Sequence, residues 1–265
     1  MAWTNDLQQH LQGRRAVVTG SGRGIGAGIA HAYAAAGASV VVTARSAGQL
    51  EHVAEEIRSQ GGVAHAVACD ITSDDDVDRL ASEAKRLLGG PIDTLVNNAG
   101  VYKSARYEDH TLSDWKWVMD VNVISTVRVT NAFLADLLSA ERSRLINLAS
   151  IAGKKGSFGQ AAYNASKHAQ IALTRCLAME YGKTNLRVNA ICPGFLKTEL
   201  VDVDALAATY QLPADELWAN VENAATIGRT VTIEEIAALA LYLASPGADG
   251  MNGQSLAIDG GITYG

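Results

Sequence analysis

Tyr163 and Lys167 stand four residues apart in the segment Tyr-Asn-Ala-Ser-Lys, and Ser150 precedes Tyr163 by thirteen residues. On a helix, residues i and i+4 share one face, so the Lys167 ammonium can lie beside the Tyr163 phenol. An ordinary phenol has a pKa of about 10, and an adjacent cation favours its ionised form. We therefore expect Lys167 to lower the pKa of Tyr163, which would act as the acid/base of a carbonyl reaction, while Ser150 orients the substrate oxygen.

A glycine-rich segment lies near the start of the chain, between an expected strand and an expected helix. Its spacing, Gly20-x-x-x-Gly24-x-Gly26, is not the G-x-G-x-x-G dinucleotide fingerprint, but glycines in such a turn allow the backbone to approach a pyrophosphate. The following helix offers free N–H groups and the positive end of its dipole. An ordinary glycine-rich turn is the alternative. The predicted dinucleotide contacts in this segment are Gly20, Ser21, Arg23, Gly24, Ile25 and Gly26.

The residues after the second expected strand indicate which dinucleotide is bound. In dinucleotide folds an acidic residue roughly 20 residues past the glycines holds the ribose 2′-hydroxyl, whereas an arginine there accommodates a 2′-phosphate. This chain has Thr-Ala-Arg-Ser over 43–46, without a carboxylate, and Arg45 offers a planar fork suited to phosphate. Arg23 could add a second positive charge, unless both arginines are ordinary surface charges. We expect NADP(H) in preference to NAD(H).

Short β-branched runs alternate with longer helical patterns along the chain. Strands are predicted over 16–19, 39–43, 64–68, 94–96, 144–148, 187–191 and 255–258, and helices over 26–36, 47–60, 74–88, 113–138, 162–181 and 233–244. Strict alternation implies a parallel sheet with helices on both faces. We expect an α/β fold with one doubly wound, seven-stranded Rossmann-type domain over 1–265. Its cofactor-binding half would span 12–110 and its catalytic half 111–265, with a helical lid at about 198–226.

Composition excludes several other classes of protein. The 265 residues are 48% hydrophobic and 19% charged, which suits a large core, and a formal charge of −6 argues against nucleic acid as a partner. No apolar run reaches 18 residues and the N-terminus lacks a signal-peptide pattern, so we expect a cytoplasmic protein with no membrane partner. Cys69, Cys176 and Cys192 form no CxxC pair and the six histidines show no ligand spacing. We therefore expect reduced, mostly buried thiols and no metal, which disfavours a zinc-dependent alcohol dehydrogenase.

The motifs also occur in the order and spacing of one enzyme family. They are the glycine segment over 19–26, Asp70, Asn-Asn-Ala-Gly over 97–100, Asn122, Ser150, Tyr163-x-x-x-Lys167, Pro-Gly over 193–194 and Asp-Gly-Gly over 259–261. From about residue 12 to 261 the chain resembles the short-chain dehydrogenase/reductase family. A Tyr-x-x-x-Lys motif alone is weak, but the ordered set is specific. The resemblance implies a Rossmann fold, reversible hydride transfer between a nicotinamide cofactor and an alcohol or ketone, and a homotetramer.

The resemblance also implies roles that local pattern leaves open. It implies that Asp70 binds the adenine amino group, although on its own this residue is more typical of a helix N-cap. It implies that Asn122 holds a water linking Lys167 to solvent, and that Lys167 binds the nicotinamide ribose. The other contacts expected with the cofactor are Ile71, Asn98, Ala99, Gly100, Pro193, Gly194 and Thr198.

The motifs do not identify the substrate. The residues expected to line its pocket are mostly apolar or aromatic, which favours a neutral carbonyl compound: Tyr102, Ile151, Ala152, Phe158, Phe195, Leu196, Leu200 and Trp218. A small or medium secondary alcohol or ketone is our first interpretation. A 3-oxoacyl thioester is the second, and it would call for a basic pocket mouth formed by Lys103, Arg106, Lys154, Lys155 and Lys197. A catalytically silent NADP(H)-binding regulatory protein is the third, although the complete set of catalytic residues argues against it.

Overall fold

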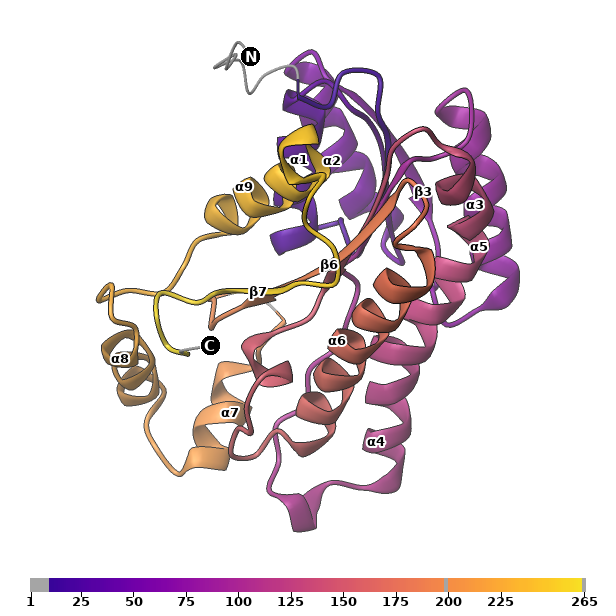
Figure 1. Cartoon of the computed structure of the whole chain (residues 1–265). Coiled ribbons are helices and arrows are strands. Elements are labelled where there is room, and N and C mark those ends of the chain that lie inside the picture. The colour runs from indigo at the N-terminus through magenta and orange to yellow at the C-terminus, as the bar shows by residue number, and fades with distance from the viewer. Residues whose placement is uncertain (1–9, 198–199, 264–265) are drawn as a thin grey trace.

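The strands of the protein form one seven-stranded parallel sheet (Figure 1). The computed structural model describes residues 10–197 and 200–263. The strands are β1 Arg15–Thr19, β2 Ser39–Ala44, β3 Val63–Ala68, β4 Thr94–Asn97, β5 Ser143–Leu148, β6 Leu186–Pro193 and β7 Ser255–Ile258. Their order is β3-β2-β1-β4-β5-β6-β7, and each neighbouring pair is parallel. All seven predicted strands are confirmed, and each predicted end lies within two residues of the observed one.

The helices follow the predicted alternation. They are α1 Gly24–Ala35, α2 Ala47–Ser59, α3 Asp74–Leu87, α4 Leu112–Met119, α5 Ser125–Ser139, α6 Ala161–Tyr181 and α9 Ile233–Ala244, with α7 Val203–Tyr210 and α8 Ala214–Ala224 in the predicted lid. The helix expected over 113–138 is interrupted, because η3 Asp120–Ile124 is a turn of π-helix between α4 and α5. Helices α7 and α8 lie apart from the two helical layers that cover the sheet (Figure 1).

Apolar side chains on both faces of the strands bury the sheet. Alternate residues of a strand point to opposite faces. Val18 and Val42 therefore pack with α1, α2 and α9, whereas Val17 and Val41 pack with α3, α5 and α6 on the other face. All four valines are fully buried. Strands covered on both faces read as continuous apolar runs, which explains why the β-branched segments predicted the sheet so well.

The strand order reverses between β1 and β4. The chain runs from β1 outward to β3 and then returns to place β4 on the other side of β1. In open α/β sheets, ligands bind in the crevice that such a reversal leaves at the carboxyl ends of the strands. The segments after β1 and β4, which contain Gly20 and Asn98, therefore lie on the two sides of this crevice.

Taken together, α4, η3 and α5 form a helical stretch over Leu112–Ser139 that is long and apolar enough to cross a membrane by length and composition alone. One such helix is weak evidence, because core helices of soluble proteins share these properties. Val129, Phe133 and Leu137 are almost fully buried against the sheet, as expected of a core helix.

The cysteines are free, with Cys69 and Cys192 buried and Cys176 exposed.

Helix α1 packs closely on α9 at Gly28. A Cβ atom at this position would lie 2.3 Å from Ile233 Cγ2, so we expect Gly28→Ala to lower the free energy of unfolding by about 1–3 kcal/mol through overpacking. Urea unfolding followed by circular dichroism measures the change. Gly48→Ala on α2 is the matched control, because a Cβ there meets no atom within 4 Å. Equal stability of the two variants would contradict the prediction.

Candidate active site

The turn between β1 and α1 needs glycine at three positions. Gly20 and Gly24 have φ of +63° and +59°, in the left-handed region that favours glycine. A Cβ at Gly26 would lie 2.5 Å from both the Gly20 carbonyl oxygen and Asn98 Nδ2. The glycines therefore allow α1 to begin close to the crevice, with its free N–H groups at this end.

Two residues predicted to touch the cofactor also have structural roles. Ser21 Oγ donates to the Val18 carbonyl at 2.7 Å and accepts the Thr43 N–H at 2.8 Å, so this fully buried side chain ties β1 to β2. Neither Ser21 nor Gly26 lines the cavity described below. Both residues shape the turn, and their contact with the cofactor stays a prediction.

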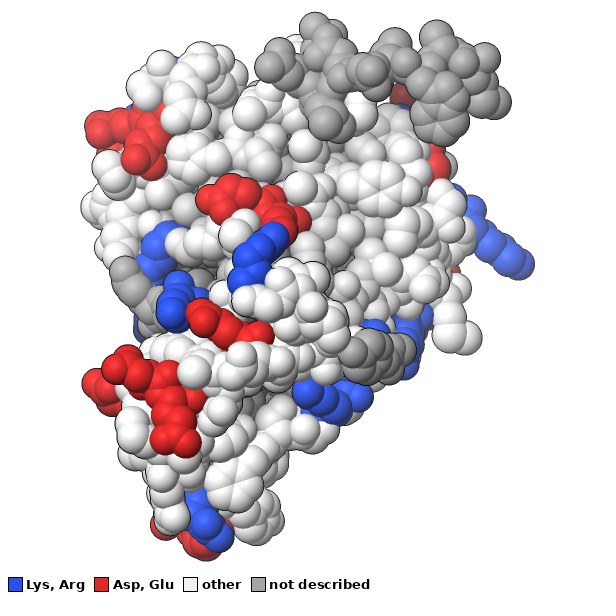
Figure 2. Space-filling view, turned by 90° about the vertical axis from the view of Figure 1, so that its left-hand side faces the viewer, with Lys and Arg blue, Asp and Glu red and all other residues white. Residues whose placement is uncertain are grey.

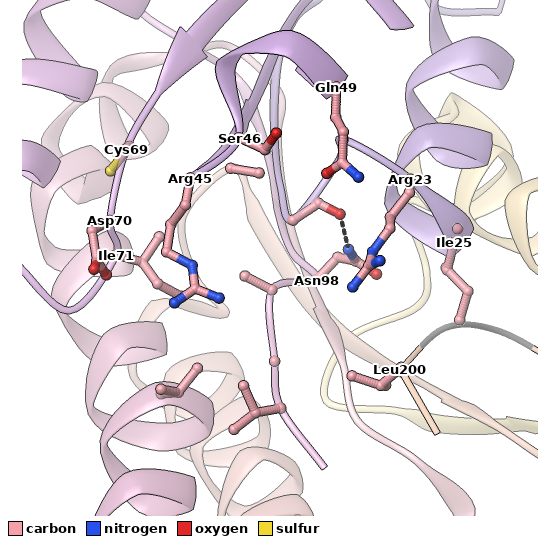
Figure 3. Close-up of a pocket in the computed structure, with 18 of the residues that line it drawn as sticks. Arg23, Ile25, Arg45, Ser46, Gln49, Cys69, Asp70, Ile71, Asn98 and Leu200 are labelled. Carbon is pink, nitrogen blue, oxygen red and sulfur yellow. Dashed lines mark hydrogen bonds between the residues drawn. The ribbon is translucent and has the colours of Figure 1, made fainter. Parts of the chain in front are cut away.

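A cavity of about 1020 Å³ occupies the crevice. The predicted contacts that line it are Gly20, Arg23, Gly24, Ile25, Arg45, Asp70, Ile71, Asn98, Ala99 and Gly100. Arg45 and Asp70 come from the ends of β2 and β3, and Arg23 comes from the glycine turn (Figure 3). The volume, the helix N-terminus and the two arginines fit a dinucleotide that carries an extra phosphate. Sequence analysis missed Gly22, Ser46 and Gln49, whose only signal was their closeness to Arg23 and Arg45 in the chain.

Asp70 does not cap a helix. Its Oδ1 accepts the N–H and the hydroxyl of Thr72 at 2.9 and 2.8 Å, and these hydrogen bonds hold the pKa of Asp70 below its ordinary value. The N-cap of α3 is Ser73, whose hydroxyl accepts the Asp76 N–H. The cap interpretation of Asp70 is therefore wrong, and the carboxylate remains at the wall of the cavity.

A second, smaller cavity adjoins the first and contains the three residues with which the sequence analysis began. Ser150 follows β5, while Tyr163 and Lys167 lie one turn apart on α6, and all three line this cavity. Lys167 Nζ lies 5.6 Å from the centre of the Tyr163 ring. The two cavities share Ile25, Asn98, Gly100, Val101 and Leu200, so they form one continuous cleft.

Burial dominates the electrostatics of this pair. It raises the pKa of Tyr163 to about 12, although a hydrogen bond with Ser150 acts in the opposite direction. It lowers the pKa of Lys167 to about 7. The structure does not reproduce the predicted lowering of the Tyr163 pKa by Lys167, because removal from water disfavours the charged form of each group. The spatial pairing of the two side chains is nevertheless as predicted.

Asn122 is fully buried in the π-turn η3 and makes no direct hydrogen bond to Lys167. Its side chain bonds both backbone groups of Val101 and donates to Ser166 Oγ. The water that Asn122 was expected to hold between Lys167 and solvent stays a prediction, but a side chain that the sequence analysis missed connects the two residues. Gln170 accepts from Lys167 Nζ at 2.8 Å and donates to the Asn122 carbonyl at 2.8 Å. Its position three residues after Lys167, on the same helical face, was the available signal.

The smaller cavity contains most of the residues predicted for the substrate pocket. The predicted residues that line it are Tyr102, Ile151, Ala152, Phe195, Leu196 and Leu200, together with the predicted cofactor contacts Pro193 and Gly194. Trp218 lines the larger cavity instead. Phe158 is half exposed, packs on Tyr210 with 5.3 Å between the ring centres and lines a separate depression, so the structure does not bring it to the smaller cavity. Thr198 lies outside the described residues. Ser157 and Gln160 were missed because polar residues were not expected in this wall.

Three of the five basic residues expected at the pocket mouth form ion pairs with acids. Lys103 pairs with Asp114 at 3.6 Å, Arg106 with Glu108 at 2.7 Å and Lys197 with Glu222 at 3.6 Å. On the face that carries α8 and α9, positive and negative side chains are interspersed (Figure 2). Over the described part of the chain, no three His, Cys, Asp or Glu side chains come together as metal ligands would.

Comparison with known proteins gives consistent matches over nearly the whole chain. The family model for enoyl-(acyl carrier protein) reductase matches residues 20–263. The 3-oxoacyl-[acyl-carrier-protein] reductase FabG of Aquifex aeolicus (strain VF5) is 34% identical over 257 residues, covering 97% of this chain and 100% of that protein.

Solved structures agree with the sequence matches. A variant of actinorhodin polyketide ketoreductase, solved with NADPH, gives a TM-score of 0.90 at 32% identity and covers 95% of this chain and 98% of its own. A 7α-hydroxysteroid dehydrogenase, solved with NADH and 7-oxo glycochenodeoxycholic acid, gives a TM-score of 0.88 at 33% identity and covers 97% of each chain. The similarity therefore extends through both halves of the fold.

Proposed function

Because the chain belongs to the short-chain dehydrogenase/reductase family, we propose that it is an NADP(H)-dependent oxidoreductase that interconverts a secondary alcohol and a ketone. The observation that carries this proposal is the meeting of Ser150, Tyr163 and Lys167 in one cavity that opens into the cleft suited to a dinucleotide. Binding of a cofactor without chemistry would not require this set of residues.

Ser150, Tyr163 and Lys167 each have a different role in reduction. When bound, the nicotinamide supplies a hydride in reduction and accepts one in oxidation. Ser150 orients the carbonyl oxygen, and Tyr163 donates its phenolic proton to that oxygen as it gains negative charge. Because burial raises the pKa of Tyr163 to about 12, the phenol is protonated at neutral pH and ready to act as the acid. Lys167 binds the nicotinamide ribose, and oxidation reverses these steps.

The preference for NADP(H) depends on Arg45 and Arg23 at the wall of the larger cavity. The related ketoreductase was solved with NADPH and the related steroid dehydrogenase with NADH, so family membership alone does not choose the cofactor. In this chain the end of β2 carries Arg45 and no carboxylate, which favours the 2′-phosphate. We assign Asp70 and Ile71 to the adenine end of the cofactor.

Two substrate classes fit the smaller cavity. The mainly apolar lining suits a small or medium secondary alcohol or ketone, and one similar structure was solved with a 7-oxo steroid. A 3-oxoacyl thioester is equally compatible with the names of the Aquifex aeolicus and actinorhodin relatives. The pairing of Lys103, Arg106 and Lys197 with acids leaves less positive charge for a carrier phosphate. NADPH oxidation against simple ketones and 3-oxoacyl thioesters separates the two classes.

We place the protein in the cytoplasm, where the reducing conditions suit its free cysteines.

Replacement of the proposed acid tests the function directly. We expect Tyr163→Phe to reduce the turnover number by a factor of about 10² to 10⁴, because general acid catalysis contributes gains of that order. NADPH affinity, measured by fluorescence titration, should change little. Tyr242→Phe is the matched control, because its hydroxyl donates to the Gly247 carbonyl on the surface. Near-normal turnover by Tyr163→Phe would reject the role of this phenol.

Arg45→Ala tests the cofactor assignment. We expect kcat/KM with NADPH to fall by about 10- to 100-fold and kcat/KM with NADH to stay nearly constant, because a charge-assisted hydrogen bond contributes about 1.5–3 kcal/mol. Arg86→Ala, on the exposed surface of α3, is the control. A wild-type preference for NADH would overturn the assignment.

A homotetramer is the proposed assembly. Large apolar side chains remain exposed along α4, η3, α5 and α6, including Leu112, Trp117, Ile124, Leu138 and Met179. Covering them by symmetry-related copies would remove apolar surface from water. Light scattering should give about four times the chain mass of 27.9 kDa, and a monomer mass would contradict this assembly.

A further inference from the structure

The Lys167 ammonium is held by two oxygen atoms inside the protein. Its Nζ donates to the Leu148 carbonyl and to Gln170 Oε1, both at 2.8 Å. Lys167 is 4% exposed and Gln170 is fully buried, so water does not replace these acceptors in the structure. An ammonium has three donors, and therefore one remains to face a ligand. A Cβ added at Gly100, which lines both cavities, would lie 3.7 Å from Nζ, so the ammonium stands beside the cleft.

The Gln170 amide is fixed in one orientation. Its Nε2 donates to the Asn122 carbonyl at 2.8 Å and to Thr126 Oγ1 at 3.1 Å. Thr126 Oγ1 itself donates to the Asn122 carbonyl, so it accepts from Gln170. Turning the amide by 180° would place its NH₂ group against the ammonium and its oxygen against a carbonyl. Both contacts would be unfavourable, and the acceptor end of Gln170 must therefore face Lys167.

This acceptor opposes the effect of burial on Lys167. Burial lowers the pKa of Lys167 to about 7, whereas a carbonyl that accepts from the ammonium favours the charged form. The ionisable groups that face Lys167 in the described residues are Tyr163 on the same helix and Cys192 on β6. The positive charges of Lys154 and Arg175 act to lower the pKa of Cys192, against the larger effect of burial. The remaining neighbours from β5 and η3 present carbonyl and amide groups.

We propose that Gln170 is a positioning residue for the reaction, because its fixed carbonyl oxygen keeps Lys167 protonated and aimed toward the cofactor cleft. The inference rests on the proposed function, since Lys167 acts there through its positive charge. The alternative is a buried amide that only completes the core around Asn122. The two roles differ in which substitution is tolerated.

Two variants of similar size separate the roles. Gln170→Met keeps the volume and removes the oxygen, whereas Gln170→Glu keeps an oxygen and removes the donor to Asn122. A core-filling role would make Met the milder change, because Glu buries a charge beside a carbonyl. The positioning role predicts the reverse order, because only Glu retains an acceptor for Lys167.

The pH dependence of kcat/KM for NADPH-linked reduction is the readout. Charged Lys167 is the active form, so activity falls as pH rises through its pKa. We expect Gln170→Met to move this alkaline limb down by about one pH unit, because the ammonium loses a hydrogen bond of order 1.5 kcal/mol. We expect Gln170→Glu to move the limb upward, because a carboxylate stabilises the ammonium. The pH dependence of NADPH affinity, followed by fluorescence, should shift in the same directions without requiring turnover.

Asn189→Leu supplies a matched loss of a buried amide. Asn189 donates to the Met251 carbonyl at 2.9 Å and accepts from the Gln254 N–H at 3.0 Å, on the other side of β6. We therefore expect Asn189→Leu to change the stability of the protein and to leave the alkaline limb in place. The inference alone would be overturned if both Gln170 variants kept the alkaline limb of the wild-type protein. It would also be overturned if both variants moved the limb in the same direction and Gln170→Met moved it less than Gln170→Glu. A wild-type protein that neither binds NADPH nor reduces any carbonyl would overturn the proposed function as well. If Gln170→Met fails to fold, Gln170→Leu, which also removes the oxygen, takes its place as the deciding variant.

Discussion

The Asn98 side chain donates to the carbonyl oxygens of Thr19 and Gly20 at 2.9 and 3.0 Å, across the point where the strand order reverses. Its backbone N–H also donates to Thr19 Oγ1. These bonds join the segments that follow β1 and β4, which the sheet hydrogen bonds no longer hold together. Because Gly26 has no side chain, α1 can begin within reach of the same amide. The position of the glycine turn, and hence the shape of the whole cleft, depends on this junction.

Burial then sets the chemistry on the other side of the cleft. Tyr163 and Lys167 both lose contact with water, and each is driven toward its neutral form: a protonated phenol and an amine with a pKa near 7. The site therefore does not rely on a simple attraction between opposite charges. Hydrogen-bond acceptors supplied by Leu148 and Gln170 compensate part of the cost of keeping a cation inside the protein. The acceptors come from β5 and α6, and the Asn122 carbonyl of η3 holds the Gln170 amide in place.

Much of the fold was predictable because its signals are local. The β-branched runs gave all seven strands, and the four-residue spacing placed Tyr163 and Lys167 on one face of α6. Other features depend on contacts between distant segments. Ser21 faces β2 instead of the cleft, Phe158 packs on Tyr210 outside the pocket, and the direction of the Tyr163 pKa shift follows from depth of burial. None of these can be read from spacing. Gln170 was visible in the sequence, but only the fold brings Asn122 within its reach.

The π-turn over Asp120–Ile124 determines how α4 and α5 are rotated relative to each other about the helix axis. Successive residues of an α-helix are separated by about 100° around the axis, so removal of the one residue that a π-turn accommodates would rotate everything on one side of it by that angle. Rotation of α5 would turn Val129, Phe133 and Leu137 away from the sheet. Rotation of α4 and η3 would withdraw the Asn122 carbonyl from Gln170. The number of residues in this segment therefore fixes the rotation of α4 relative to α5. Substitutions in the segment are tolerated more readily than the insertion or deletion of a residue.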